Sequence, residues 1–326
     1  MAQWLLHICF EKKVKLIEGI ELSNLCDYSF GDQSGSFGNI YTHFMKPANL
    51  LNLEFVEKVL SMNKDYMTLF IDNIRLYNRE IKNLKPQDKI YVDSLMKEND
   101  LLDLCSKFSD KKFIIFTNLE DTPIDEFIFD RIPKNVLSIN AVNAVSYGGK
   151  VNPIPYGVQR RFSPNDNRVE ILLSFIQNNE SIECKNLLYV NHSVNTNSKE
   201  RQGIKELFLN KAWAMVEEGM VDYFTYLSNL KDSKFMICPI GNAMDCHRNW
   251  EVLYMKRVPV MKKHPYLEEL FKDYPVLFVE KYSDIDENLL LSNQFLFDNM
   301  QQVDIKKLDL NEFYDRMVYN SLKKDD

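Results

Sequence analysis

The chain has 326 residues, of which 45% are hydrophobic and 27% are charged, and its formal net charge is −7. This composition can fill a sizeable core and excludes disordered, fibrous and low-complexity chains. At about 100–200 residues per domain, the length favours two domains. An acidic chain has no general electrostatic attraction to nucleic acids or anionic lipids, so neither is a favoured partner.

The sequence offers little sign of export or membrane insertion. The first apolar stretch contains His7 and has its charges after it, which is the reverse of a signal peptide. Apolar runs such as 113–116 and 171–176 are far shorter than the ~18 residues of a spanning helix. The six cysteines are scattered without a CxxC pair. We therefore expect reduced thiols in a cytoplasmic protein without a transmembrane segment.

The first half of the chain predicts alternating strands and helices. Residues 1–30 suggest two short strands, and the glycine-rich stretch 31–38 indicates a turn. The other expected elements are helices over 52–60, 74–81, 93–108 and 125–131, and strands over 66–71, 90–92, 113–117 and 136–139. Such alternation is typical of a parallel sheet covered by helices.

A boundary between two domains is expected in the stretch 148–157, which holds three glycines and two prolines. We assign residues 1–157 to an N-terminal Rossmann-like domain on the acceptor side and residues 158–300 to a C-terminal Rossmann-like domain. Residues 301–326 are expected to form a C-terminal helix that could pack back on the N-terminal domain.

The second half predicts a doubly wound α/β domain. The expected strands are 187–190, 235–238, 258–261 and 276–279, and the expected helices are 167–177, 199–217 with a break near 210, 222–230, 246–255, 265–271, 286–299 and 311–322. Ligands bind at the carboxyl ends of the strands in such folds. The loops after Val190, Cys238 and Met261 are therefore candidates for a binding site.

The densest group of polar residues lies in the stretch 239–251, PIGNAMDCHRNWE. Asp245 is expected to cap a helix whose first two turns carry His247, Arg248 and Glu251. Free amides at a helix N-terminus beside an arginine form an anion site that suits phosphate, and a nearby glutamate suits the paired hydroxyls of a ribose. The alternative is an ordinary capped helix with an internal Arg248–Glu251 ion pair.

Residues 234–261 resemble the signature of exostosin-like glycosyltransferases: a strand, Pro-x-Gly-Asn, Asp-x-His-Arg, Trp-Glu and a Pro-Val strand. The stretches 188–201, LYVNHSVNTNSKER, and 153–157, PIPYG, extend the resemblance upstream. It implies the GT-B architecture, in which two Rossmann-like domains face each other across a cleft. The sequence departs from the family pattern at Lys256 and Arg257, where a small residue commonly precedes the Pro-Val strand.

The resemblance also implies roles for individual residues. Glu251 would bind the donor ribose, Arg248 and Arg201 would contact the diphosphate, and Asp245 and His247 would orient the loop. Gly241 and Asn242 would let the backbone approach the donor. Fixed cations and amides would stabilise the departing diphosphate, so we expect a nucleotide-diphosphate sugar as the donor substrate and no metal or other cofactor.

An inverting enzyme would need a base on the N-terminal side of the cleft. The residues considered are Asp32, His43, Glu120 and Asp121, and we take Asp121 and Asp32 as the candidates. Asp284 and Asp286 form a DxD pattern, which we interpret as helix capping rather than a metal site.

The sequence therefore predicts a glycosyltransferase (a hexosyl- or pentosyltransferase) that moves a sugar to an acceptor hydroxyl in surface glycan or polysaccharide biosynthesis. A fucosyltransferase-like enzyme is an alternative, although that pattern lacks the His-Arg pair. The acceptor could also be a small molecule, a protein or a modified nucleobase. A non-catalytic protein that binds nucleotides or glycans is the alternative from another class.

Overall fold

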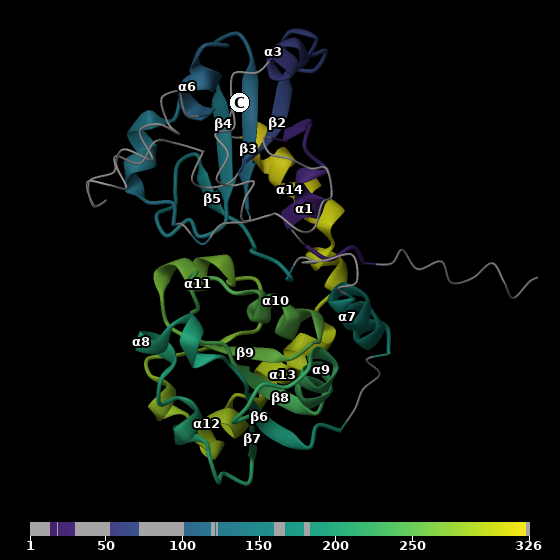
Figure 1. Ribbon diagram of the computed structural model, residues 1–326, viewed down its shortest axis with the longest axis vertical. Coiled ribbons are helices and arrows are strands. Elements are labelled where there is room, and N and C mark those ends of the chain that lie inside the picture. The colour runs from purple at the N-terminus through teal and green to yellow at the C-terminus, as the bar shows by residue number, and fades with distance from the viewer. Residues whose placement is uncertain are drawn as a thin grey trace, which may run out of the picture.

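The computed structural model describes residues 14–17, 19–29, 53–71, 101–118, 121, 123–159, 167–178 and 183–323. Within these residues the chain forms two five-stranded sheets, and every strand pair is parallel. The sheets lie in the upper and lower halves of the molecule in Figure 1. The predicted α/β organisation with parallel sheets is thus confirmed.

The N-terminal sheet has the strand order β1-β2-β3-β4-β5. Its elements are β1 (Tyr28–Ser29), β2 (Tyr66–Ile71), β3 (Lys112–Thr117), β4 (Val136–Ala141) and β5 (Val151–Pro153), with α1 (Gly19–Ser23), α3 (Leu53–Leu60), α6 (Leu101–Ser106) and the 3-10 helix η1 (Glu126–Arg131). Two expectations were wrong: α1 lies where a short strand was expected, and β5 lies inside the expected domain boundary. The elements expected over 74–81 and 90–92 lie outside the described residues.

The side chains of the central strands alternate between the two faces of this sheet, as the period of two in a strand requires. Phe113 and Ile115 of β3 face a core that includes residues of α3 and α6. Ile114 and Phe116 of the same strand face a separate cluster, which contains Phe313 of the C-terminal helix. Both faces are therefore covered, as is usual for a parallel sheet.

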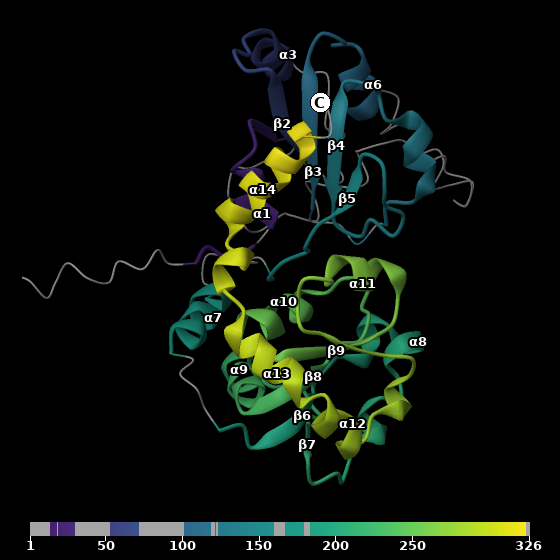
Figure 2. The same ribbon diagram turned by 180° about the vertical axis from the view of Figure 1, so that it is seen from behind.

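The C-terminal helix α14 (Leu310–Lys323) completes the N-terminal sheet, and Figure 2 shows it lying across that sheet. The Ser321 hydroxyl lies 2.6 Å from that of Ser138 on β4, and the Tyr314 hydroxyl donates to Thr68 on β2. The Tyr314 ring also stacks on Phe116, with 5.2 Å between the ring centroids. The N-terminal unit thus combines the two ends of the chain.

The C-terminal sheet has the strand order β10-β9-β8-β6-β7. Its strands are β6 (Asn186–Val190), β7 (Ala214–Val216), β8 (Ser233–Ile237), β9 (Val258–Lys262) and β10 (Leu277–Val279). The accompanying helices are α7 (Arg168–Gln177), η2 (Val194–Thr196), α8 (Ser198–Arg201), η3 (Lys205–Leu207), α9 (Tyr223–Lys231), α10 (His247–Tyr254), α11 (Pro265–Leu270), η4 (Tyr282–Asp284), α12 (Glu287–Ser292), α13 (Gln294–Gln302) and η5 (Ile305–Leu308).

The prediction of helices over 199–217 was largely wrong. Only two short helices, α8 and η3, form there, and residues 214–216 pair with β6 as the edge strand β7. The backbone at Asn210 adopts a left-handed conformation with φ of 65°. Such a residue interrupts a right-handed helix, and asparagine tolerates it better than most residues do.

The strand order places a topological switch point between β6 and β8. After β6 the chain forms β7, which pairs with one edge of β6. It then forms β8, which pairs with the other edge of β6. Ligands of doubly wound sheets bind in the crevice outside the carboxyl ends of the strands at such a point. The loops after β6 and β8 are therefore the place to look for a site.

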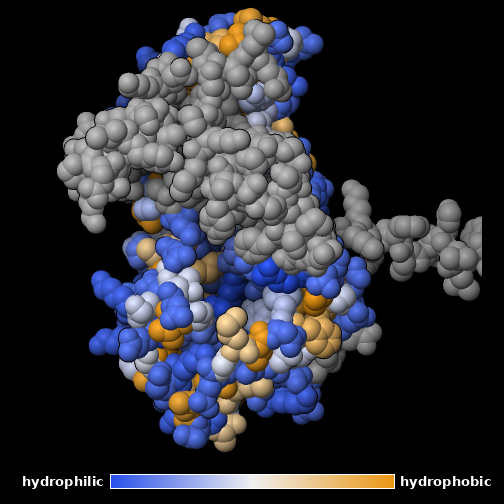
Figure 3. Space-filling view, in the orientation of Figure 1, coloured by the Kyte–Doolittle hydropathy of each residue, from blue (hydrophilic) through white to orange (hydrophobic). Residues whose placement is uncertain are grey.

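The two halves of the molecule meet at α10 and α11. The Asn143 amide donates to the Tyr266 hydroxyl on α11 over 3.0 Å, and the Ile17 amide donates to the Tyr254 hydroxyl on α10 over 2.8 Å. In Figure 3 the surface of the C-terminal half is recessed and hydrophilic at this level of the molecule. Among the residues described here, no helix has the length and apolar character needed to cross a membrane.

Candidate functional site

Arg248 lies in the first turn of α10, which follows the loop after β8. It is half-buried, and its Nε atom is buried without a hydrogen-bond partner among the described residues. No ion pair between Arg248 and Glu251 occurs in this part of the chain, although the two interact electrostatically. The alternative of an internal Arg248–Glu251 ion pair is therefore not the observed arrangement. A cation at a helix N-terminus that forms no ion pair within the described residues is suited to an anionic ligand.

Glu251 lies one turn further along α10 and is 6% exposed. One carboxylate oxygen accepts from the Tyr223 hydroxyl over 2.9 Å, and the other accepts from the Tyr226 hydroxyl over 3.0 Å. Burial raises the pKa of Glu251, although the two tyrosines and Arg248 oppose this effect. Each carboxylate oxygen has two lone pairs, so both can still accept a further hydrogen bond from a hydroxyl.

Arg201 at the end of α8 forms hydrogen bonds with backbone carbonyl groups. Its guanidinium donates to the carbonyl oxygens of Ser193, Pro239 and Ile240 at 2.9–3.0 Å, and the residue is 4% exposed. Arg201 therefore ties the loop after β6 to the loop after β8. The predicted direct contact with a diphosphate does not fit a buried guanidinium held by three carbonyl groups, and we correct its role to positioning.

Gly241 is needed for the same packing. A Cβ atom there would lie 2.9 Å from an Arg201 nitrogen and 3.1 Å from the Cys246 sulfur. The group that approaches Gly241 closely is thus the Arg201 side chain, rather than a ligand as expected from the sequence. Asn242, the next residue, is exposed.

Asp245 is fully buried just before α10. One carboxylate oxygen accepts from the Tyr156 amide and from Trp250 Nε1, both over 2.8 Å, and the other accepts from the Asn249 amide group over 2.9 Å. Cys246 occupies the N-cap position, so the prediction that Asp245 caps the helix was wrong by one residue. Asp245 instead joins the segment between the two sheets to α10.

His247, two residues after Asp245, contacts the same segment between the two sheets. Its Nδ1 lies 2.8 Å from the Gly157 carbonyl oxygen, and its ring lies 4.6 Å from the ring of Tyr156. The Tyr156 hydroxyl donates to Asp121 over 3.2 Å. The structure thus brings Asp121, an exposed carboxylate beyond β3, toward the first turn of α10 through Tyr156. Asp32, His43 and Glu120 lie outside the described residues.

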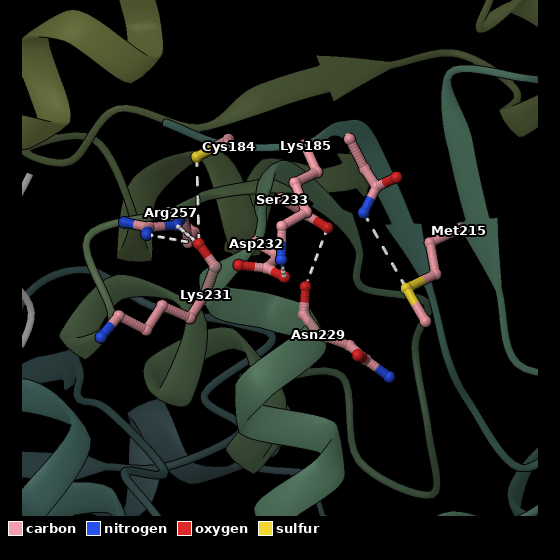
Figure 4. Close-up of polar contacts among 9 residues, drawn as sticks. Cys184, Lys185, Met215, Asn229, Lys231, Asp232, Ser233 and Arg257 are labelled. Atoms are coloured by element: carbon pink, nitrogen blue, oxygen red, sulfur yellow. Dashed lines mark hydrogen bonds and ion pairs between the residues drawn. The ribbon is translucent and has the colours of Figure 1, made fainter. Parts of the chain in front are cut away.

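Arg257 stands before the Pro-Val strand, where the family pattern has a small residue, but its side chain does not narrow the candidate site. Its guanidinium donates to the carbonyl oxygens of Lys231, Met255 and Lys256, and Figure 4 shows the contacts to Lys231. These atoms lie at the amino end of β9, which is the edge of the parallel sheet opposite the candidate site. Lys256 has a φ of 54°, which explains why a small residue is suitable at that position.

Asp284 and Asp286 behave as capping residues, as expected. Asp286 accepts from the Leu289 amide at the start of α12 over 2.7 Å, and Asp284 accepts from the Lys281 amide over 3.1 Å. Within the described part of the chain, no group of three or more histidine, cysteine or acidic residues is arranged to hold a metal ion.

Three residues of the site have no role in the sequence analysis. Tyr223 and Tyr226 are one turn apart on α9 and both reach Glu251, which their spacing of three residues permits. His192 is the second residue after the end of β6 and is 2% exposed. Its position shortly after a buried strand was the sequence signal that could have identified it as a site residue.

Comparison with known protein families gives no matching family, and comparison with curated proteins gives no relative of this chain.

Proposed function

We propose that this protein is a glycosyltransferase of GT-B architecture that transfers a sugar from a nucleotide-diphosphate donor to an acceptor hydroxyl. The observation that carries the proposal is Arg248, a cation without an ion-pair partner among the described residues, one helical turn from the buried carboxylate of Glu251. The pair lies beside the switch point of the C-terminal sheet. The 239–251 motif and its resemblance to exostosin-like enzymes support the same proposal.

In this proposal Arg248 and the free amides of α10 bind the diphosphate and stabilise the charge that develops as it departs. Glu251 accepts hydrogen bonds from the ribose hydroxyls, while Tyr223 and Tyr226 hold its carboxylate in place. Arg201 and Asp245 position the loops, and no step uses a metal ion. The enzyme would act in the cytoplasm on a growing surface glycan or polysaccharide.

Asp121 is the proposed base within the described residues. Its carboxylate is exposed and accepts from Tyr156, whose ring contacts His247 beside Arg248. A base in this position would take the proton of the acceptor hydroxyl and support inversion at the sugar carbon. Replacing Asp121 by asparagine should then lower turnover strongly while leaving donor binding unchanged.

The first test is a thermal-shift panel of UDP, GDP, CDP, ADP and their common sugars. A ligand at about a hundred times its Kd stabilises the folded state by roughly 2.7 kcal/mol, which raises Tm by several degrees. We expect one nucleotide to stand out without added metal. A flat panel, with and without Mg²⁺ and Mn²⁺, would contradict the proposal.

Matched variants connect that binding to the site. Charge-assisted hydrogen bonds contribute roughly 1.5–3 kcal/mol each, so Arg248→Ala and Glu251→Ala should each weaken nucleotide binding by roughly tenfold to a hundredfold. Arg316→Ala removes an exposed arginine from α14 and should bind as the wild type does. Equal losses in all three variants would argue against the assigned site.

Turnover distinguishes the remaining alternatives. A protein that binds the nucleotide sugar but never releases the nucleoside diphosphate with any acceptor is a sensor rather than an enzyme. Release that depends on a GDP-fucose donor favours the fucosyltransferase-like alternative. Glycan, small-molecule, protein and modified-nucleobase acceptors are compared in the same assay.

A further inference from the structure

The hydrogen bond of one ring nitrogen of His192 determines whether the other nitrogen carries a proton. Its Nε2 lies 3.2 Å from the Arg201 carbonyl oxygen, and its Nδ1 is buried without a partner among the described residues. A carbonyl oxygen can only accept a hydrogen bond, so Nε2 carries the proton. In the neutral ring, Nδ1 is then a bare lone pair.

The largest electrostatic effects of side chains on this ring come from cations. Among the described residues these are Arg201 of α8, Lys205 of η3 and Arg248 of α10, and each lowers the pKa of His192. Burial and these three charges lower the pKa of His192 to about 4, so the ring is neutral near pH 7. Three cations around a neutral, buried imidazole form an electrostatic environment that an anion would reverse.

Only part of this positive charge is satisfied by the protein. Arg201 donates to three carbonyl oxygens, and Lys205 donates to the Glu217 and Glu218 carbonyl oxygens. Arg248 retains an Nε–H without a partner in the described part of the chain. The two unpartnered buried nitrogens, on Arg248 and His192, therefore belong to the segments that follow β8 and β6, the two strands at the switch point.

We propose that His192 takes up one proton from solvent when the phosphate groups of the donor bind beside Arg248, and that Nδ1–H then donates to a phosphate oxygen. The inference rests on the proposed function for the identity of the ligand. A bare lone pair would repel a phosphate oxygen, whereas a protonated ring adds a charge-assisted hydrogen bond. The proton returns to solvent when the diphosphate leaves, so no covalent step is involved.

This coupling has a direct consequence for affinity. Between the pKa of the ring in the free protein, about 4, and its higher pKa in the complex, each pH unit should cost the wild type up to tenfold more affinity for a diphosphate than a variant without the titrating ring. His192→Asn is the matched variant, because its amide can donate near the Nδ1 position without taking up a proton. It should bind more weakly near pH 6 and lose less affinity between pH 6 and pH 8.

The experiment is calorimetric titration of the full chain with inorganic pyrophosphate and with the nucleotides of the panel. Titrations at pH 7 in two buffers of different ionisation enthalpy give the number of protons taken up. Comparing wild type with H192N removes the contribution of the ligand's own titration. NMR of wild-type protein with ¹⁵N-labelled histidine adds a readout that needs no variant, since the chain has five histidines.

We expect greater proton uptake in the wild type than in H192N, and one ring that is neutral in the free protein and protonated in the complex. Nucleotide binding with equal uptake in both proteins and no protonated ring would overturn this inference and leave the proposed function standing. If pyrophosphate binds with proton uptake but no nucleotide binds, the proposed function is overturned and the inference about His192 stands. If neither ligand binds, both are wrong.

Discussion

The residues that hold the start of α10 are buried polar groups, and Asp245 is the one with the most partners. Three N–H groups from three residues donate to its carboxylate, and no solvent reaches it. Burial nevertheless raises the pKa of Asp245 from its ordinary 3.8 to about 6, because these hydrogen bonds only partly offset desolvation. The Asn249 side-chain oxygen beside it is itself buried without a partner in the described residues.

Asp245 should make stability depend on pH. The folded protein holds this proton more tightly than the unfolded chain, so its contribution is fully present below about pH 4 and lost as pH rises through about 6. A shift of about two units corresponds to about 3 kcal/mol. In Asp245→Asn this dependence disappears, and the Asn249 oxygen can accept from the new amide.

Denaturant unfolding at intervals between pH 4 and pH 7 measures this effect. The difference in unfolding free energy between wild type and D245N should change by about 3 kcal/mol across the range, in favour of the variant at the higher pH. Parallel stability curves would contradict the assignment of this titration to Asp245.

The chemical types of the site residues were predictable from the sequence, but their partners were not. The 239–251 motif gave Arg248 and Glu251 through their spacing on one helix. The roles of Arg201 and Tyr226 depend on contacts with Ile240 and Glu251, which are 39 and 25 residues away along the chain. Local spacing carries no information on contacts at that separation.

At the scale of elements, Gly157 fixes where the segment from the first sheet turns toward the second. Its φ is 77°, and a Cβ there would lie 2.2 Å from the Ile17 carbonyl oxygen, which itself accepts from the Val158 amide. The clash and the left-handed backbone together should cost Gly157→Ala at least about 3 kcal/mol of stability.

The matched control for this substitution is Gly219→Ala. A Cβ at Gly219 meets no atom within 4 Å, so the change should stay within about 0.5 kcal/mol of wild type. Thermal unfolding of both variants measures the difference, and similar Tm values for the two would show that Gly157 is replaceable.

Arg257 makes a separate prediction, because it acts at the opposite edge of the sheet from the site. Arg257→Met leaves the carbonyl oxygens of Lys231, Met255 and Lys256 without the guanidinium. The Lys231 and Lys256 oxygens keep the Cys184 thiol and the Gln301 amide group as donors, so we expect a loss of about 1–3 kcal/mol, the cost of about one buried hydrogen-bonding group. Nucleotide binding by the remaining folded protein should be unchanged, and weakened binding at equal occupancy would place Arg257 in the site.

Elements with a strong apolar pattern were predicted well. Residues 67–71 and 258–261 are buried, so their apolar runs suit central strands. The edge strands β5 and β7 were missed, whereas β10, which also has three residues, lies in the apolar run 276–279 and was predicted. β5 lies in the stretch 148–157, which is rich in glycine and proline, and β7 lies in a stretch that was expected to be helical. Such short segments are defined by pairing with a neighbour, and no period is visible within them.

At the scale of the whole molecule, α14 makes the N-terminal sheet depend on the end of the chain. Phe313 is 4% exposed and packs in the cluster that contains Phe70, Ile114 and Phe116. Phe313→Ala should therefore cost about 3–5 kcal/mol, as for other buried aromatic residues. Asn320→Ala changes an exposed position of the same helix and should leave the stability unchanged. Denaturant unfolding measures both, and equal midpoints would mean that α14 does not stabilise the sheet.

The return of the C-terminal helix to the first sheet also sets an order of events during synthesis. Tyr314 and Thr68 bond across 246 positions of sequence, so their contact cannot form until α14 has left the ribosome. The second sheet has all of its own strands available earlier. The half that is translated first would therefore be finished last, with the apolar face formed by Ile114 and Phe116 exposed in the meantime. Translation speed and chaperone binding thus bear most heavily on the N-terminal half.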